Sequence, residues 1–180
     1  MIRKTLLIAV AVAAIATAIA LPVAAAAEKV GFGFNATDVQ GFRTGSVALS
    51  GGGAFDPVTG FVHSGGGFSC LEDVDQGPLT GCLAGEGVRW DTANLLRNTT
   101  FKCTGAASEA LKPAVTGPTT AVIQADFYRA GDANDESFTA QIIVSRDDIA
   151  LDMPGVQNVW VQGVGCGFAV GGFNSATGAN

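Results

Sequence analysis

The stretch SVALSGGGAFDPVTGFVHSGGGFSC, residues 46–70, contains two similar arms around a compact turn. Each arm carries three consecutive glycines and a phenylalanine, and the turn between the arms reads DPVTG, residues 56–60. Pro57 suits the second position of a type I turn because its φ is already fixed near the required value, and Gly60 can adopt the positive φ that returns the chain to a strand. The stretch therefore predicts a β-hairpin.

The glycines of the two arms lie opposite each other in this hairpin. If paired residues have numbers that sum to about 116, residues 51–53 face residues 65–67 and leave a patch of sheet almost without side chains. Strand glycines are typical of bends and of places where another group packs closely on the backbone. We expect an aromatic ring from the same chain, Trp90 or Trp160, to cover this patch. A ligand groove is the alternative.

The hairpin also carries a longer pattern, G-x-F-D-x-x-T-G-x-V-x-x-G-G-G-F, which runs from Gly53 to Phe68. This pattern resembles hairpins of uncharacterised secreted bacterial proteins that are rich in β-strands. The resemblance covers a small part of the chain. It implies export and a β-rich fold, and it implies no particular activity.

The first 27 residues are predicted to be a cleaved signal peptide. Arg3 and Lys4 form a basic start, residues 6–20 are almost uninterruptedly apolar, and Ala27 ends a run of small residues suited to signal peptidase. The apolar run is shorter than the ~20 residues that a membrane-spanning helix needs. We therefore expect residues 28–180 to be a single soluble domain that is secreted, either extracellular or periplasmic, with no membrane contact after cleavage.

The charge balance excludes some partners of this domain. Without Arg3 and Lys4, eight basic residues remain against sixteen acidic ones, and no basic run occurs. Nucleic acids and anionic membrane surfaces attract basic patches, so neither is an expected partner.

The cysteines are even in number, and an exported chain favours disulfides over free thiols. No C-x-x-C pair is present and the chain has one histidine, so the spacing matches no zinc site. Of the three possible connectivities, we prefer Cys70–Cys82, which closes a short loop after the hairpin, together with Cys103–Cys166, which ties a middle strand to the last one.

Apolar and polar residues alternate in further segments of the domain, which predicts strands with one buried and one wet face. These segments are residues 88–96, 99–103, 121–129, 137–146 and 156–170. In the first segment, Val88 and Trp90 are expected to face inward. The last segment is expected to be one long curved strand whose buried face comprises Trp160, Val164, Cys166, Phe168 and Val170.

The only helical signal in the domain lies at residues 106–112, and Pro113 ends it. We therefore predict an all-β domain of about seven or eight antiparallel strands, with at most one short helix near residues 106–112. Such strands close either into a β-sandwich or into a β-barrel.

Most catalytic signatures are absent from the sequence. His63 is the only histidine, and neither G-x-S-x-G nor H-E-x-x-H occurs, so no nucleophile and base set is evident. His63 is interpreted as a polar strand residue, and Tyr128 falls on the polar face of its strand. These two side chains are the possible ligand contacts.

Two acidic groups are candidates for chemistry. Glu72, Asp73 and Asp75 could cleave a glycosidic bond only if one acid lay in an apolar pocket at a defined distance from another. The second group comprises Asp132, Asn134 and Glu136, which alternate as in the first half of a calcium loop. That loop also needs a glycine and a closing acid that this chain lacks, so we expect a solvated turn, no metal and no cofactor.

These observations favour a non-enzymatic binding or structural module of the cell exterior. Carbohydrate or another exported protein is the expected partner. A carbohydrate-active enzyme that uses Glu72, Asp73 or Asp75 is the alternative.

Overall fold

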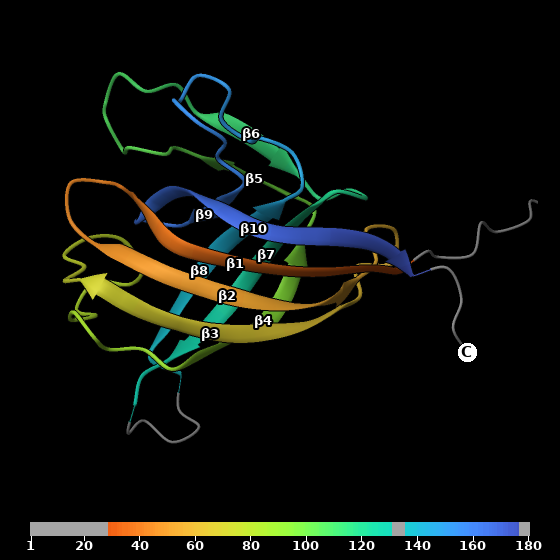
Figure 1. Ribbon diagram of the computed structural model, residues 1–180, viewed down its shortest axis with the longest axis horizontal. Coiled ribbons are helices and arrows are strands. Elements are labelled where there is room, and N and C mark those ends of the chain that lie inside the picture. Colours follow the sequence, from red (N-terminus) through yellow and green to blue (C-terminus); the bar gives the residue numbers. More distant parts are fainter. Residues whose placement is uncertain (1–28, 131–135, 177–180) are drawn as a thin grey trace, which may run out of the picture.

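The computed structural model describes residues 29–130 and 136–176, and within them eight strands form a closed antiparallel barrel (Figure 1). The order around the barrel is β1-β10-β9-β8-β7-β4-β3-β2, and β5 pairs with β6 in a separate two-stranded sheet. No helix forms in the described residues, so the all-β prediction is confirmed, and of the two predicted architectures the barrel is the one that forms. The strands are β1 (Lys29–Gly41), β2 (Ser46–Phe55), β3 (Val62–Glu72), β4 (Arg89–Leu96), β5 (Asn98–Phe101), β6 (Lys112–Val115), β7 (Thr120–Tyr128), β8 (Phe138–Ser145), β9 (Val159–Val161) and β10 (Gly165–Ala176).

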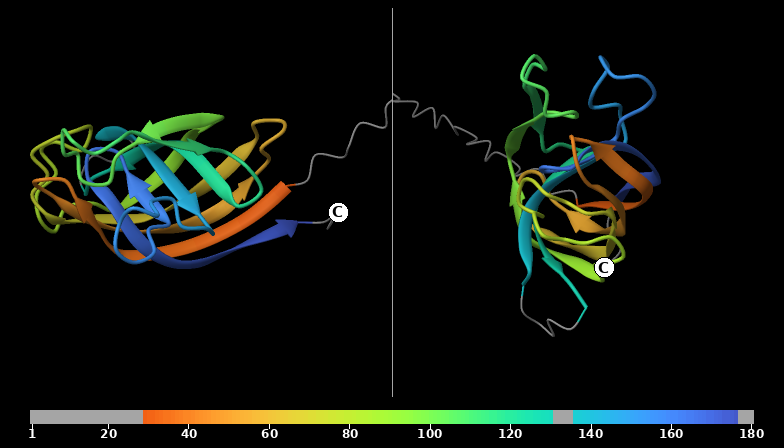
Figure 2. Two further views of the ribbon diagram at one scale, coloured as in Figure 1. Left: turned by 90° about the horizontal axis from the view of Figure 1, so that it is seen from above. Right: turned by 90° about the vertical axis from the view of Figure 1, so that its left-hand side faces the viewer.

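The barrel is a meander with one interruption. Chain neighbours pair with each other from β1 to β4 and from β7 to β10, while the β5–β6 hairpin lies outside the barrel between β4 and β7. The long strands β1 and β10 then pair with each other and close the barrel (Figure 2). Closure leaves no unpaired sheet edge in the barrel itself.

The predicted hairpin is formed by β2 and β3, with a register one residue from the expected one. Paired residues sum to 117, as in Gly51↔Gly66, so the glycine triplets overlap with a one-residue offset. The buried carboxylate of Asp56 accepts hydrogen bonds from the backbone N–H groups of Val58 at 2.8 Å and Thr59 at 3.2 Å. Gly60 adopts φ +79°, which confirms its predicted role in the turn.

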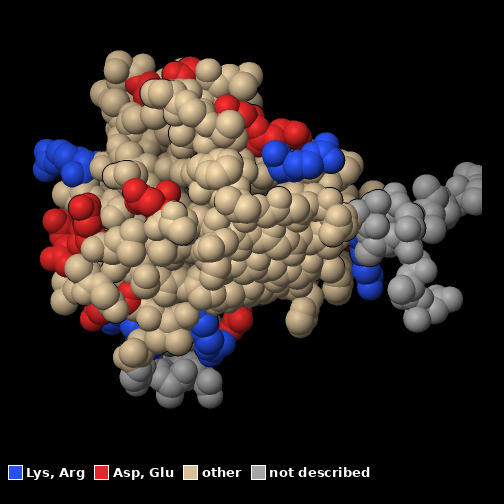
Figure 3. All heavy atoms as spheres, in the orientation of Figure 1, with Lys and Arg blue, Asp and Glu red and all other residues tan. Residues whose placement is uncertain are grey.

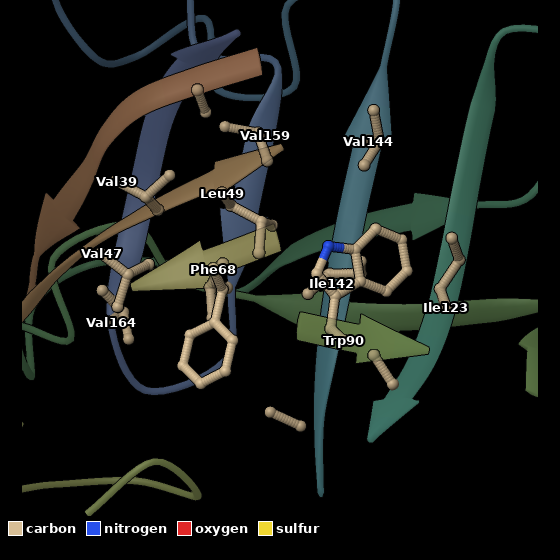
Figure 4. Close-up of a cluster of buried hydrophobic side chains, with 14 of the residues drawn as sticks. Val39, Val47, Leu49, Phe68, Trp90, Ile123, Ile142, Val144, Val159 and Val164 are labelled. Atoms are coloured by element: carbon tan, nitrogen blue, oxygen red, sulfur yellow. The ribbon is translucent and has the colours of Figure 1, made fainter. Parts of the chain in front are cut away.

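The barrel interior is a packed apolar core. Side chains from opposite strands point toward one another inside it (Figure 4), and the ring centroids of Phe68 and Phe127 lie 4.9 Å apart in an edge-to-face pair. The described members of this cluster are all apolar or disulfide-bonded residues. The interior is therefore the stabilising core of the fold.

Trp90 covers the glycine patch from inside the barrel, as predicted. The ring is fully buried, its Nε1 donates to the backbone oxygen of Ser50 at 2.9 Å, and a Cβ added at Gly51 would come within 2.5 Å of the ring. Trp160, the other candidate, does not cover the patch. It lies in a second cluster, where its ring centroid is 5.7 Å from that of Phe101.

This second cluster lies outside the barrel wall, beneath the β5–β6 hairpin. That hairpin and the loop of residues 146–158 project on the same side of the barrel (Figures 1 and 2). They cover the outer side of β8 and β9 and the adjoining ends of β7 and β10, so Val122, Ile143, Trp160 and Cys166 are buried outside the barrel wall. The buried members of the cluster are Phe101, Cys103, Ala114, Val122, Ile143, Ala150, Trp160 and Cys166.

The four cysteines form the two predicted disulfides, Cys70–Cys82 and Cys103–Cys166. The second bond ties the segment after β5 to the start of β10. Two disulfides indicate an oxidising, extracytoplasmic environment.

Residues 156–170 do not form the single strand that alternation predicted. The chain reverses at Gly163, which adopts φ +81°, and the two halves pair with each other as β9 and β10. Phe168 and Val170 were expected inside and are 55% and 70% exposed. They share the outer side of β10 with Cys166, but the second cluster ends before reaching them. Val88 was also expected inside and is 51% exposed, because it precedes the first residue of β4.

The helical signal at residues 106–112 corresponds to a turn that leads into β6. The carboxylate of Glu109 accepts hydrogen bonds from the backbone N–H groups of Cys103 at 2.7 Å and Thr104 at 2.8 Å, and from Lys112 Nζ at 2.6 Å. Burial raises the pKa of Glu109, but these bonds and one from the Thr104 hydroxyl outweigh it and lower the pKa to about 2. An ionised carboxylate thus holds the loop in a non-helical form.

Candidate ligand-binding face

The outer side of β10, β1, β2 and β3 forms one continuous surface, which we call the glycine face. Because successive strand residues point to opposite sides, the residues between the buried ones make up this face. Its middle row runs in register across the sheet as Gly172, Gly33, Gly52 and Gly65. The full set is residues 31, 33 and 35 of β1, 48, 50, 52 and 54 of β2, 63, 65, 67 and 69 of β3, and 168, 170, 172 and 174 of β10.

None of the residues in this set is charged (Figure 3). Most are glycine, alanine, serine or asparagine, so few atoms rise above the backbone. The surrounding acidic and basic side chains gather at the ends and rims of the barrel (Figure 3). The glycine face is therefore a flat, neutral field on an otherwise acidic protein.

Two shallow hollows lie on the β3 side of the glycine face. The larger one, of about 380 Å³, has Gly52 and Gly65 in its lining together with His63 and Asp91. The smaller one, of about 220 Å³, has Gly67 and Ser50 in its lining. The outward glycines therefore border hollows that also have side chains in their lining, while Trp90 covers the glycine patch from the inside.

The larger hollow is lined by residues of β2, β3 and β4, and a set of charged and aromatic contacts extends from Asp91 along β4 and onto β7. Arg89 forms an ion pair with Asp91 and places its guanidinium 4.0 Å from the ring centroid of Tyr128. In the sheet, Asp91 lies opposite Gly65 on β3, and Arg89 lies opposite Tyr128 on β7. The structure thus puts both predicted contacts outside the barrel. His63 lies in the hollow, and Tyr128 lies one strand beyond it, beneath Arg89.

The hollow holds polar groups without a catalytic arrangement among the described residues. His63 is exposed, and no hydrogen bond joins it to Asp91 or to the hydroxyls nearby. Those hydroxyls, Ser64 Oγ and Thr92 Oγ1, bond to each other, and Thr92 Oγ1 also donates to the Ser64 backbone oxygen at 3.1 Å. The groups can donate to and accept from a ligand, but no base is aligned with a nucleophile.

The acidic group near Cys70 lies away from this hollow. Glu72, Asp73 and Asp75 are all exposed, and Asp73 accepts a hydrogen bond from the backbone N–H of Ala84 at 2.8 Å. A glycosidase acid lies in an apolar pocket, and none of these three side chains is buried.

The candidate calcium loop is only partly described. Asp132 and Asn134 lie outside the described residues, and Glu136 accepts a hydrogen bond from the Thr139 hydroxyl. In the described part of the chain, no group of three or more side chains is placed to hold a metal ion.

Sequence reasoning missed a further groove, of about 410 Å³, between β5 and the β9–β10 turn. Its polar groups are amides and hydroxyls: Thr99 Oγ1 donates to Gln141 Oε1 at 2.6 Å, and the Gln141 backbone N–H donates to Gln162 Oε1 at 3.0 Å. Phe42 and Leu111 are among its apolar residues. Its lining comes from segments far apart in the sequence, so no local pattern signals it.

No described helix has the length and apolar character needed to cross a membrane. No family model, no curated protein and no solved structure matches this chain, and the resemblance of its hairpin to those of secreted bacterial proteins stays a prediction.

Proposed function

We propose that this protein is an exported, non-enzymatic binding module that acts at the cell exterior. In this proposal residues 1–27 are a cleaved signal peptide, and the domain of residues 28–180 binds carbohydrate or another exported protein. The observation that carries the proposal is the placement of polar groups. The barrel interior is packed with apolar side chains, whereas His63 and Asp91 line one outer hollow, and Arg89, paired with Asp91, stacks on Tyr128 beside it.

The scaffold suits recognition by a preorganised surface. His63 projects from β3, Asp91 and Arg89 from β4, and Tyr128 from β7, which are paired strands of a closed barrel. Two disulfides add to the rigidity of the domain. Groups held on rigid strands lose little conformational freedom when a ligand binds, so more of the interaction energy appears as affinity.

The carbohydrate-active enzyme is the weaker alternative. Glu72, Asp73 and Asp75 are exposed to solvent, and none of them lines the hollow that contains His63. Glycoside hydrolysis needs a protonated acid at neutral pH, which requires burial or a close second carboxylate.

The test is a panel of polysaccharides incubated with the secreted protein, with binding and release of reducing sugar measured in the same samples. We expect binding without sugar release, and about a tenfold loss of affinity in Tyr128→Ala, because the guanidinium of Arg89 loses its aromatic support. Thr100→Ala, an exposed change on β5, is the control. Protein recovered from the medium should begin at Glu28.

Two results would contradict the proposal. Sugar release that is abolished by Glu72→Gln, Asp73→Asn or Asp75→Asn would establish the enzyme. Protein retained in the cytoplasm with Met1 still in place would refute export.

A further inference from the structure

The strand glycines of β1, β2, β3 and β10 divide into two groups when a Cβ is placed on each. In the first group the added Cβ would lie within 3.0 Å of another atom, usually backbone of the next strand, so packing requires glycine. This group comprises Gly41, Gly51, Gly52, Gly53, Gly65, Gly66, Gly165, Gly167 and Gly171.

In the second group nothing in the described chain requires glycine. At Gly31, Gly33 and Gly67 the added Cβ meets no atom closer than 3.5 Å, and at Gly172 it meets none within 4 Å. None of these four residues has a positive φ. A side chain would fit at each position, and it would strengthen the strand because glycine is among the poorest strand formers.

All four unconstrained glycines lie on the glycine face. A side chain at any of them would stand out from the sheet and break the flat surface. Their common effect is to let an external molecule approach the backbone of β1, β3 and β10 closely. Barrel packing therefore demands glycine at Gly52 and Gly65 of this face, but not at the four unconstrained positions.

We propose that the glycine face is the docking surface for a neutral polysaccharide chain, which lies flat across β10, β1, β2 and β3. This inference rests on the proposed binding function and names its ligand class. The ligand is neutral because the face carries no charge, although residues 28–180 hold eight basic and sixteen acidic residues. A charged ligand would leave its charge unpaired at this surface.

The size of the face favours a glycan over a protein. Four strands spaced about 4.8 Å apart, with outward residues spread over about 20 Å, give a surface on the order of 400 Å². A stable protein interface takes about 800 Å² from each partner. A second copy of this chain would therefore have to extend over the charged rims, where two acidic molecules repel each other.

The side chains that remain on the face match the groups of a sugar. Asn35, Ser50, Ser69 and Asn174 make no side-chain hydrogen bond within the described residues, so they can bond to sugar hydroxyls. Phe168 lies on the outer side of β10 and is 55% exposed, which offers an apolar ring to the C–H face of a sugar.

The test uses native gels that contain one polysaccharide each: mixed-linkage β-glucan, glucomannan, arabinogalactan, amylopectin or the anionic polygalacturonate. Wild-type protein should be retarded by at least one neutral polysaccharide and not by polygalacturonate. Gly33→Val and Gly172→Val should each lower the affinity at least tenfold, because the branched side chain lifts the glycan from the sheet. Their melting temperatures should stay the same or rise by about 2 to 4 °C.

Thr100→Val on β5 provides the matched control, with the same added residue outside the glycine face, and should bind like wild type. Equal retardation of Gly33→Val, Gly172→Val and wild type would overturn the docking face and leave the binding module standing. A lowered melting temperature in both variants would show that packing needs these glycines and would overturn the inference. If the wild-type protein self-associates in size-exclusion chromatography and Gly33→Val abolishes this association, the glycine face binds a second copy of the chain and not a glycan. If the protein binds no polysaccharide, a carbohydrate ligand is excluded both for the proposed function and for this inference.

Discussion

Neighbouring glycines of β3 should respond in opposite ways to the same substitution. Gly66 points into the barrel, where an added Cβ would lie 1.9 Å from the Ser50 backbone oxygen and 2.5 Å from Gly51 Cα. Gly67 points outward, and its nearest contact would be 3.5 Å away, at Ser50 Oγ. The obstacle at Gly66 is backbone of β2, which is paired with β1 on one side and β3 on the other, so it cannot move aside.

The magnitude follows from the kind of clash. Overpacking of a core side chain costs about 1 to 3 kcal/mol, and a clash with paired backbone belongs at the upper end of that range. Gly66→Val should therefore lower the free energy of unfolding by about 3 kcal/mol, which in a domain of this size lowers the melting temperature by about 6 to 12 °C. Gly67→Val should leave stability unchanged or raise it by up to about 1 kcal/mol.

The assay is urea unfolding of the oxidised domain, followed by tryptophan fluorescence, because Trp90 is buried beside the glycine patch. The slope of the free energy against urea concentration should be the same in both variants, so that the midpoints report stability alone. Equal midpoints for Gly66→Val and Gly67→Val would refute the division of glycines into constrained and unconstrained positions.

Two further predictions concern the β5–β6 hairpin. Because folding lowers the pKa of Glu109 from 4.5 to about 2, its stabilising effect is complete above about pH 4.5 and is lost as the pH falls toward 2. Glu109→Gln should therefore lower the free energy of unfolding by about 1 to 3 kcal/mol at pH 7, as measured by urea titration. If the difference from wild type does not shrink at pH 3, the Glu109 charge is not the source of the stabilisation. The double variant Cys103→Ser, Cys166→Ser should lower the free energy of unfolding by about 4 kcal/mol, because the bond closes a loop of 63 residues and restricts the unfolded chain. Calorimetry measures this change, and an unchanged melting temperature would contradict it.

The sequence predicted the features that depend on local chemistry. The hairpin of β2 and β3 could be read from its turn residues, and the outward position of Tyr128 followed from strand alternation. The β1 strand was missed because its outward positions, Gly31 and Gly33, are not polar and so produce no clear alternation. The turn at Gly163 was missed for a related reason, because glycines alternate regularly on both sides of it.

The arrangement of the site needed information that no local pattern contains. Alternation placed His63 and Tyr128 outside, but only the pairing of β4 with both β3 and β7 puts Asp91 and Arg89 between them. The runs AVI at residues 121–123 and IIV at 142–144 indicate burial on both faces, yet they do not say what covers the outer one. The covering hairpin and its disulfide come from distant segments.

The pairing of β1 with β10, from Lys29↔Ala176 to Gly41↔Gly165, joins the first strand of the domain to the last. Contacts so far apart in sequence form slowly, because a long loop must close before they contribute. Until β10 has been made, β1 and β9 are both open edges, so a growing chain cannot complete the barrel early. The topology therefore delays closure of the barrel until its last strand is available, and a chain that ends before Gly165 should aggregate through those edges.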